Sequence, residues 1–320
     1  MNFFRSVQFA PAFAGVFFCA VLAGCATPQV SQLRGDALQT AMAPVADNAQ
    51  VPFFAQKEYE CGPASLAMVM TAAGVPVSPE ALVEQVYLPA RKGSLQVEML
   101  AATRQRGLFA FTLQPSVRAL LQEVAAGHPV LVLQNLSLPL VPVWHYAVVI
   151  GYNLERNTIT LHSGETERLE MSLFTFERTW ARGNHWAMLA LAPGVLPVSA
   201  DAGTVARSAA ALEASHPAVA RRVYTAAVQR WPLDAPLQLG LGNSAYADKD
   251  VPAAVAAYQA AVKLQPDYAD AWNNLAQAQV DLGNRNAAVD AIAQAVRLGG
   301  PRLASYQSLQ SQIQARPPFP

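Results

Sequence analysis

The sequence predicts two folded parts: an α+β domain with its helices first and an antiparallel sheet afterwards, followed by an all-α domain of helical repeats. Three observations support this prediction. Apolar residues change from helical spacing to strand-like runs along residues 51–193, a Pro- and Gly-containing linker covers residues 194–203, and residues 204–316 repeat at a constant interval. The 22 basic and 22 acidic residues balance, so charge gives no indication of nucleic-acid binding.

The helices and strands of the first domain follow from local patterns. "CGPASLAMVMTAAG", which starts at Cys61, has apolar residues at helical spacing, and Pro63 suits a first helical turn. Further helices are expected over 78–86, 94–107 and 116–127, with Ser78 capping the first of them. The expected strands cover residues 108–114, 129–135, 145–153, 158–164 and 186–193. Such an order is typical of an α+β domain.

The N-terminus is typical of an exported lipoprotein. Arg5 precedes an apolar run from Phe9 to Ala23, which is short for a membrane span and placed like the core of a secretory signal. The run ends in "LAGC", which resembles a bacterial lipobox, so residues 1–24 are expected to be a signal peptide and Cys25 the lipidated residue. A single transmembrane anchor is the alternative.

The residues after Cys25 bear on location. Because Ala26 rather than Asp follows Cys25, the usual sorting rule predicts an outer-membrane protein that faces the periplasm and contacts the membrane through its lipid alone. Residues 25–50 lack aromatic side chains and are rich in Ala, Gln and Pro, so a tether is expected there.

Cys61 is the one thiol that remains once the signal is removed and Cys25 is acylated. An unpaired Cys in an exported protein is either a small core residue or a reactive nucleophile. Cys61 stands at the expected start of a helix, where unsatisfied N–H groups and the helix dipole lower the pKa of a thiol. Gly62 beside it would leave room for a substrate carbonyl.

A thiol nucleophile needs a general base and an oxyanion donor. The candidate bases are the four histidines of the domain: His128, His145, His162 and His185. His145 opens a predicted strand, where a fixed backbone suits a base, although each histidine taken alone could equally be structural. Gln56, upstream of Cys61, is a candidate oxyanion donor together with the Cys61 backbone N–H. The histidines form no H-E-x-x-H motif, so neither a metal nor another cofactor is expected.

Several segments together resemble one family. They are Gln56, "ECGPASLAMV", "GSLQVEMLAATRQRGL", "GHPVLVLQN" and "HYAVVIGYN". In this combination the chain resembles the C39-like cysteine peptidases of the papain superfamily over about residues 51–190. The resemblance implies a papain-like fold over 51–193, with Cys61 as nucleophile, His145 as base and acid, and Gln56 as oxyanion donor.

One position departs from that family. C39-like peptidases usually have an Asp on the strand after the His hairpin, where it orients the imidazole. Here the strand reads "ITLHSGETERL", so Ser163, or less favourably His162, occupies the place. A serine hydroxyl can accept a hydrogen bond from the imidazole but stabilises imidazolium less than a carboxylate does. A slow peptidase or an inactive peptidase-like domain is therefore an alternative to an active enzyme.

The C-terminal part repeats every 34 residues. The matching positions are Ala220, Ala254 and Ala288; Tyr224, Tyr258 and Ile292; Ala227, Ala261 and Ala295; and Pro232, Pro266 and Gly300. This resembles the tetratricopeptide pattern, with a degenerate first repeat, two good ones and a capping helix over 301–314. An Ala-rich bundle with accidental periodicity is the alternative. The resemblance implies that the repeats bind a protein or peptide partner.

These observations favour a lipid-anchored periplasmic cysteine peptidase that hydrolyses peptide bonds through a Cys-His pair and recruits a partner through its repeats. The alternative is a catalytically weak or inactive interaction lipoprotein. A third reading is another papain-like reaction, such as amide hydrolysis in cell-wall peptides or acyl transfer, although "CGPA" differs from the Asp-Cys-Ser-Gly of cell-wall amidases.

Overall fold

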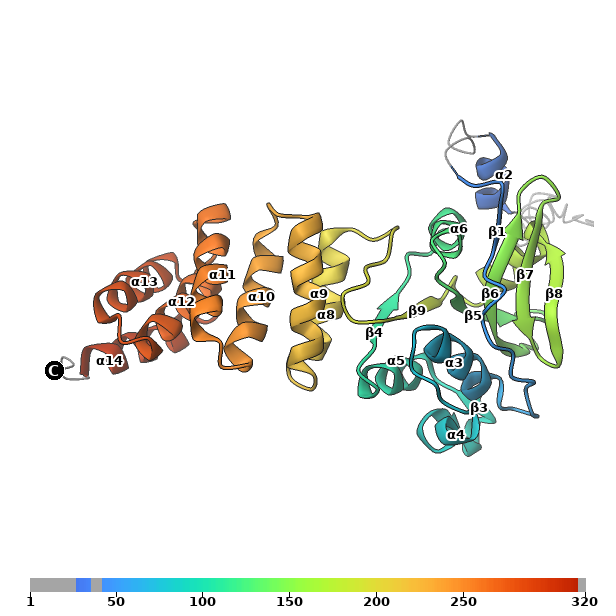
Figure 1. Cartoon of the computed structure of the whole chain (residues 1–320), viewed down its shortest axis with the longest axis horizontal. Helices are drawn as coiled ribbons and strands as arrows, with labels where there is room; N and C mark the ends of the chain where they lie inside the picture. The colour runs from blue at the N-terminus through green and yellow to red at the C-terminus, as the bar shows by residue number, and fades with distance from the viewer. Residues whose placement is uncertain (1–26, 36–41, 316–320) are drawn as a thin grey trace, which may run out of the picture.

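The computed structural model describes residues 27–35 and 42–315. The expected signal peptide, residues 1–24, and the expected lipidation site, Cys25, lie outside the described residues. The molecule is elongated, with a sheet and its covering helices at one end and a row of helices running from them to the C-terminus (Figure 1).

The sheet is antiparallel throughout its described strands, with the order β4-β9-β5-β6-β7-β8 and with β1 paired to β6. Its strands are β1 (Val45–Asp47), β4 (Phe109–Thr112), β5 (Val130–Asn135), β6 (Trp144–Asn153), β7 (Thr158–Ser163), β8 (Thr166–Ser172) and β9 (Ala187–Leu191). A separate hairpin consists of β2 (Tyr87–Leu88) and β3 (Gly93–Ser94), joined by a 3-10 turn at Pro89–Arg91.

Helices cover both faces of the sheet. One face packs against α3 (Cys61–Ala72), α4 (Glu80–Val86) and α5 (Gln96–Gln105), and the other against α2 (Pro28–Gly35), α6 (Val117–Ala125) and α7 (Leu173–Ala181). Along β6, Tyr146 and Val148 belong to the core on the side of α3, α4 and α5. Ala147 and Val149 belong to the core on the side of α2, α6 and α7. Burial on both faces explains why the central strands read as continuous apolar runs.

The expected helices and strands of this part are confirmed, and sequence reasoning missed both the exposed edge strand β8 and the short helix α7, which buries Phe176 and Trp180. β8 lies at the sheet edge, and five of its seven residues are exposed, so its apolar alternation is limited to Leu169 and Met171. The short helix α7 had one signal that could have revealed it, because Ser172 caps it by accepting a hydrogen bond from the Thr175 N–H. The expected cap of the helix at 78–86 is shifted. Ser78 Oγ accepts a hydrogen bond from the Ala81 N–H, but α4 begins at Glu80 and Pro79 occupies the N-cap position.

The expected tether over residues 25–50 is wrong for the described part of that segment. The carboxylate of Glu177 in α7 accepts hydrogen bonds from the backbone N–H groups of Gln29 (3.0 Å) and Val30 (2.8 Å), which fixes the start of α2. Val30 itself is fully buried. β1 can join the sheet because Gly151 faces it, where a Cβ would lie 2.8 Å from the Ala46 carbonyl oxygen. The described part of this segment therefore packs against the domain through hydrogen bonds and strand pairing, although it has no aromatic side chain.

The predicted repeats are confirmed, since residues 202–298 form three helix pairs and a further helix follows them. The pairs are α8 (Ala202–Glu213) with α9 (Pro217–Arg230), α10 (Ala235–Ala247) with α11 (Val251–Leu264), and α12 (Ala269–Asp281) with α13 (Arg285–Leu298); α14 (Leu303–Ala315) is the last helix. Gly240 and Gly242 of α10 receive the rings of Tyr224 and Tyr258, where any Cβ would overlap the ring carbons. Small residues therefore set the close approach of the helices.

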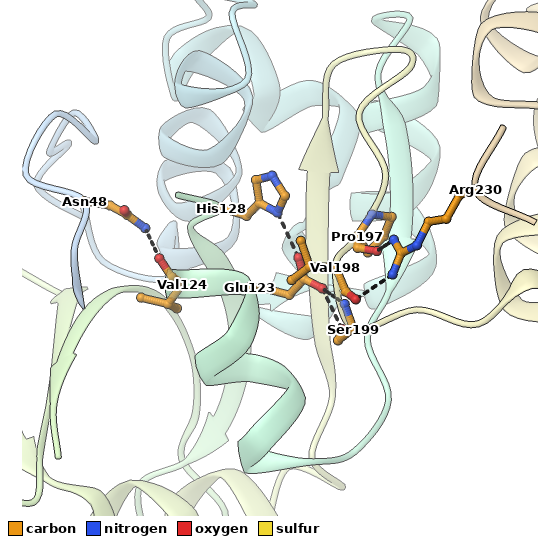
Figure 2. A network of polar contacts seen from close by, with 8 residues as sticks. All are labelled: Asn48, Glu123, Val124, His128, Pro197, Val198, Ser199 and Arg230. Carbon is orange, nitrogen blue, oxygen red and sulfur yellow. Dashed lines mark hydrogen bonds and ion pairs between the residues drawn. The ribbon is translucent and has the colours of Figure 1, made fainter. Parts of the chain in front are cut away.

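Polar contacts hold the expected linker, residues 194–203, in place (Figure 2). The fully buried carboxylate of Glu123 in α6 accepts hydrogen bonds from the Ser199 backbone N–H (2.8 Å) and hydroxyl, and it contacts Nδ1 of His128 at 2.8 Å. Arg230 of α9 donates to the carbonyl oxygens of Pro197 and Val198. The linker is thus a fixed part of the junction.

The two parts also share one hydrophobic core. Phe109 and Phe111 of β4 lie in the same cluster as Val205 of α8 and Val223 of α9. The first helix pair therefore packs on part of the sheet, and the row of repeats continues from it (Figure 1).

Candidate active site

A cleft of about 930 Å³ opens where α3, the β2–β3 hairpin and the start of β6 meet. Cys61, His145 and Gln56 all line it. The full lining comprises Gln56–Tyr59, Cys61, Arg91–Gln96, Leu133, Pro142–Tyr146, Gly164–Glu165 and Gly183–Asn184. The fold thus brings three of the predicted site residues into one concave surface, the kind of place where ligands bind.

Cys61 is the half-buried first residue of α3, a helix that buries nine of its twelve residues. Burial raises the pKa of the Cys61 thiol, and the backbone N–H groups of Tyr146, Gly62 and Cys61 oppose this rise without cancelling it. The sequence argument predicted a lowered pKa from the helix N-terminus alone. It was wrong in direction because it took no account of the packing around the sulfur. The neutral thiol is the favoured form.

Gly62 serves a purpose other than the one expected. A Cβ at Gly62 would lie 2.2 Å from the Oγ of Ser94, so the glycine accommodates the β2–β3 hairpin rather than an incoming carbonyl. The Ser94 hydroxyl is buried and has no hydrogen-bond partner. Tyr146, next to His145, donates its phenol hydrogen bond to the Ser94 backbone carbonyl oxygen at 3.1 Å. These contacts fix the hairpin as one wall of the cleft.

His145 lies on β6 with its Nε2 2.9 Å from the Oγ of Ser163 on β7. Burial lowers the pKa of His145, which favours the neutral imidazole. When Nε2 carries the proton, the ring donates it to Ser163, and the lone pair of Nδ1 stays free to accept another proton. The hydrogen-bond partner expected from the sequence is therefore present, as a hydroxyl and not as a carboxylate.

Gln56 is buried and already engaged. Its Nε2 donates to the Ser65 hydroxyl and to the Tyr146 carbonyl oxygen, each at 3.2 Å. An amide has two N–H hydrogens, so donation to an oxyanion would require the loss of one of these bonds. Sequence reasoning missed Ser65, yet it follows Cys61 by four residues and so lies on the same face of the helix.

The other three histidines serve the fold. His162 is buried, with Nε2 3.1 Å from the Val51 carbonyl oxygen and Nδ1 accepting from the Arg168 N–H. It therefore does not take the place of the missing Asp. His128 contacts Glu123 at the junction, and His185 packs edge-on against Trp180. Of the four, His145 alone lines the cleft.

Two carboxylates follow Ser163 closely in the sequence, at Glu165 and Glu167. Glu165 lines the cleft at the β7–β8 turn, whereas Glu167 lies near His162 and raises its pKa, against the larger lowering effect of burial. Sequence reasoning also missed Asn184, an exposed cleft residue with a φ of 55° in a tight turn. The "GNH" turn signal at 183–185 could have flagged that conformation.

Neither a metal site nor a membrane span is found in the described part of the chain. No group of three or more His, Cys, Asp or Glu residues there is arranged to hold a metal ion. Among the same residues, no helix combines the length and the apolar character that crossing a membrane requires.

Comparisons with known proteins divide the chain in the same way. Residues 48–187 match the model of the Peptidase_C39 like family, and residues 205–269 and 239–302 match a tetratricopeptide repeat model. No curated protein matches the chain.

Solved structures similar to each part are also found. A C39-like peptidase from Bacillus anthracis shares 18% identity at a TM-score of 0.40, over 47% of this chain and 98% of that one. The TPR2B domain of yeast Sti1, from a complex with pHsp70, shares 20% identity at a TM-score of 0.33, over 35% and 98%. MamA shares 19% identity at a TM-score of 0.33, over 35% and 66%. On the two family models, residues 48–187 of this chain are a C39-like peptidase domain, and tetratricopeptide repeats follow it over residues 205–302.

Proposed function

We propose that this chain is a cysteine peptidase that hydrolyses peptide bonds through Cys61 and His145, while its repeats recruit a protein or peptide partner. The observation that carries the proposal is the cleft. Its lining includes both a half-buried thiol at a helix start and the imidazole of His145, whose Nε2 lies 2.9 Å from the Oγ of Ser163. A nucleophile and a base oriented by a third group are the arrangement that covalent acyl transfer requires.

In the proposed reaction, the Sγ of Cys61 attacks the peptide carbonyl carbon while Nδ1 of His145 takes the thiol proton. The carbonyl oxygen becomes an oxyanion, for which the backbone N–H groups of Cys61 and Gly62 in the first turn of α3 are candidate donors. Collapse breaks the C–N bond, and the imidazolium gives its proton to the leaving amine. Water, deprotonated by His145, then hydrolyses the thioester and restores the thiol.

The pKa directions bear on how the reaction starts. Burial raises the pKa of Cys61 and lowers that of His145, so both groups rest in their neutral forms. Proton transfer therefore accompanies attack on a bound substrate, and the free enzyme does not hold a preformed ion pair. We expect activity to need the neutral imidazole, so it should persist below the ordinary imidazole value of about 6.5 and fall only as the pH drops through the lowered pKa of His145.

The repeats offer a groove for a partner. Two adjoining hollows are lined by uncharged polar side chains of α10, α12 and α14, among them Asn243, Asn274, Gln277 and Gln312. Amide side chains can both donate to and accept from a peptide backbone. Recruitment of an extended segment by this groove would raise its effective concentration near the cleft.

We further propose that Cys25 carries a lipid and that the protein is attached to the outer membrane facing the periplasm. The lipobox-like "LAGC" and the following Ala26 support this part. Mass spectrometry of the mature N-terminus tests it. A diacylglyceryl group on Cys25 that disappears in Cys25→Ala is the expected result, and an unmodified or uncleaved N-terminus would contradict it.

The test of the reaction uses a peptide library with cleavage followed by mass spectrometry. Cys61→Ala should abolish cleavage, and His145→Ala should lower its rate about 10²- to 10⁴-fold. His216→Ala, in the turn between α8 and α9, is the matched control and should keep full activity. A thioester adduct on Cys61 that accumulates with slow substrates would identify the intermediate.

The alternative is a non-catalytic peptidase-like scaffold, and two observations favour it. A neutral hydroxyl stands where the family usually has a carboxylate, and the Gln56 amide is already hydrogen-bonded. If the folded protein cleaves no peptide and alkylation of Cys61 proceeds at the same rate in wild type and His145→Ala, the scaffold reading holds and the peptidase proposal fails.

A further inference from the structure

The connection between β5 and β6 exposes an unusual amount of apolar surface. In this segment, residues 136–144, Leu140 is 94% exposed, Val141 68% and Leu138 67%. Leu136, Val143 and Trp144 are exposed as well, and the segment "LSLPLVPVW" contains no charged residue. Contiguous exposed apolar groups of this kind mark binding sites more often than ordinary surface. We call this segment the apolar hairpin.

The apolar hairpin is ordered by its own hydrogen bonds. The buried side chain of Asn135 accepts hydrogen bonds from the backbone N–H groups of Ser137 and Val143, both at 3.0 Å. The Leu136 N–H donates to the Val143 carbonyl oxygen at 2.9 Å, and Leu138 and Val141 pair across the tip. These bonds hold the hairpin backbone in one conformation, and its apolar side chains are exposed to water. Such a preorganised surface loses little conformational entropy when it binds.

The base of the apolar hairpin is part of the cleft. Pro142, Val143 and Trp144 line the same cleft as Cys61, and Trp144 directly precedes His145. Leu140 lies four residues before Trp144, so at about 3.3 Å per residue the tip is roughly 13 Å from the base. A peptide in extended conformation spans that distance with about four residues.

We propose that the apolar hairpin is a substrate subsite that binds bulky apolar side chains of an extended peptide, within about four residues of the bond that is cleaved. The inference rests on the proposed peptidase function, which supplies the peptide and the cleft. Continuity between hairpin and cleft favours a peptide, because any chain leaving the cleft on this side passes over the hairpin. A membrane-inserting segment usually carries Lys or Arg beside its apolar residues, and residues 136–144 carry none.

The test measures binding and cleavage separately. The full chain with Cys61→Ala is titrated with fluorescent dodecapeptides that have Leu, Phe, Ser or Glu at each position in turn, and binding is followed by anisotropy. The key variant adds Leu138→Ser, Leu140→Ser and Val141→Ser, all at exposed positions where the fold should be unaffected. The control adds Leu233→Ser instead, at a position 82% exposed between α9 and α10.

We expect the Leu and Phe peptides to bind at least tenfold more tightly than the Ser and Glu peptides at one or two positions. The triple variant should lose this preference, and the Leu233→Ser control should keep it. Equal binding of all peptides, or a preference that survives the triple substitution, would overturn the inference. So would a dimer, or binding to phosphatidylethanolamine–phosphatidylglycerol vesicles, that the triple substitution weakens, because another occupant would then cover the hairpin.

Cleavage of the same peptides by the chain with Cys61 intact separates the two proposals. Preferential binding without any hydrolysis supports the subsite and refutes the peptidase function. Hydrolysis that shows no apolar preference, with the triple variant equally active, supports the peptidase function and refutes the subsite.

Discussion

The peptidase domain and the repeat region are assembled in opposite ways. In the repeats, each helix packs mainly on its sequence neighbour, as when Tyr258 of α11 rests on Gly242 of α10. In the peptidase domain, the cleft combines a helix start, a strand and a distant turn, and Ser163 contacts His145 from the neighbouring strand. A short-range pattern therefore suffices to specify the repeats, whereas the candidate site exists only once the sheet has formed.

The junction between the two parts, formed by the linker and the first helix pair, does not fit this simple division. Repeat proteins are approximately sums of units that interact with their nearest neighbours. Here the first helix pair shares its core with the sheet, and the linker is hydrogen-bonded to Glu123 and Arg230. We therefore expect α8 and α9 to behave energetically as part of the peptidase domain, while α12 to α14 behave as independent repeats.

Of the substitutions that test whether α8 and α9 are energetically part of the peptidase domain, Trp180→Ala should have the largest effect on stability. Trp180 is fully buried, stacks on Phe176 and belongs to the core that also contains repeat residues such as Val205. We expect a loss of about 3–5 kcal/mol in the free energy of unfolding. Hydrogen exchange should then accelerate in α8 and α9 as well as in the sheet.

Tyr306→Ala in α14 is the counterpart at the far end of the molecule. Tyr306 is buried in the separate core of the last repeats. Its loss should cost about 2 kcal/mol and accelerate exchange only in α13 and α14. If Trp180→Ala left exchange in α8 and α9 unchanged, the shared core would not couple the two parts.

Glu123→Gln tests the junction directly, with an expected loss of about 2 kcal/mol in unfolding free energy. The buried carboxylate serves Ser199 and His128 with its two oxygens, and an amide retains only one acceptor oxygen (Figure 2). Proteolysis within residues 194–203 should become faster.

Glu170→Gln is the matched control for this substitution, because Glu170 forms an exposed ion pair with Arg156. It should cost less than about 0.5 kcal/mol. Equal effects of the two substitutions would mean that the Glu123 hydrogen bonds contribute little to holding the linker, which would leave Arg230 and apolar packing to hold it.

What could be predicted from the sequence also differs between features set by nearby residues and features set by residues distant in the chain. The 34-residue columns and the apolar strands could be predicted because they depend on local periodicity. The helical start at Pro28 and the engaged Gln56 amide could not, because they depend on Glu177, Ser65 and Tyr146, which become neighbours only in the folded chain. The direction of the Cys61 pKa shift was predicted wrongly for the same reason, because the burial that raises this pKa also arises only in the folded chain.

Mild acid should destabilise the peptidase domain in particular. Burial lowers the pKa values of His145, His162 and His185, so the unfolded chain binds more protons than the folded one below about pH 6.5. The free energy of unfolding should therefore decrease as the pH falls from about 6.5 through the lowered pKa values of these histidines. The decrease is at most about 1.4 kcal/mol per pH unit for each histidine. Urea unfolding between pH 7 and 5 measures the slope.

Two substitutions sharpen the acid experiment. His162→Gln should reduce the slope, since it removes one buried titrating group. Asp250→Asn in the repeats should leave it unchanged, because the hydrogen bond from Arg221 lowers the pKa of that carboxyl below its ordinary value, outside this pH range. A slope that His162→Gln does not alter would show that other groups titrate in this window.

Ser163→Ala should have the smallest effect, about a tenfold drop in kcat/KM, because it removes one hydrogen bond from a ring that β6 already holds. Ser163→Asp should act differently. A carboxylate beside Nε2 would raise the pKa of His145 and move the acid limb of the pH profile of kcat/KM upward.

Thr160→Ala, on the same strand β7 but not the hydrogen-bond partner of His145, controls for general damage to the sheet and should leave the profile unchanged. An acid limb that stays in place in Ser163→Asp would mean that His145 is not the titrating base. If the Asp variant instead gains activity together with the shifted limb, the serine is what makes this site slow. In that case the limit on the rate lies in how the base is supported within the sheet, because a hydroxyl stabilises imidazolium less than a carboxylate does.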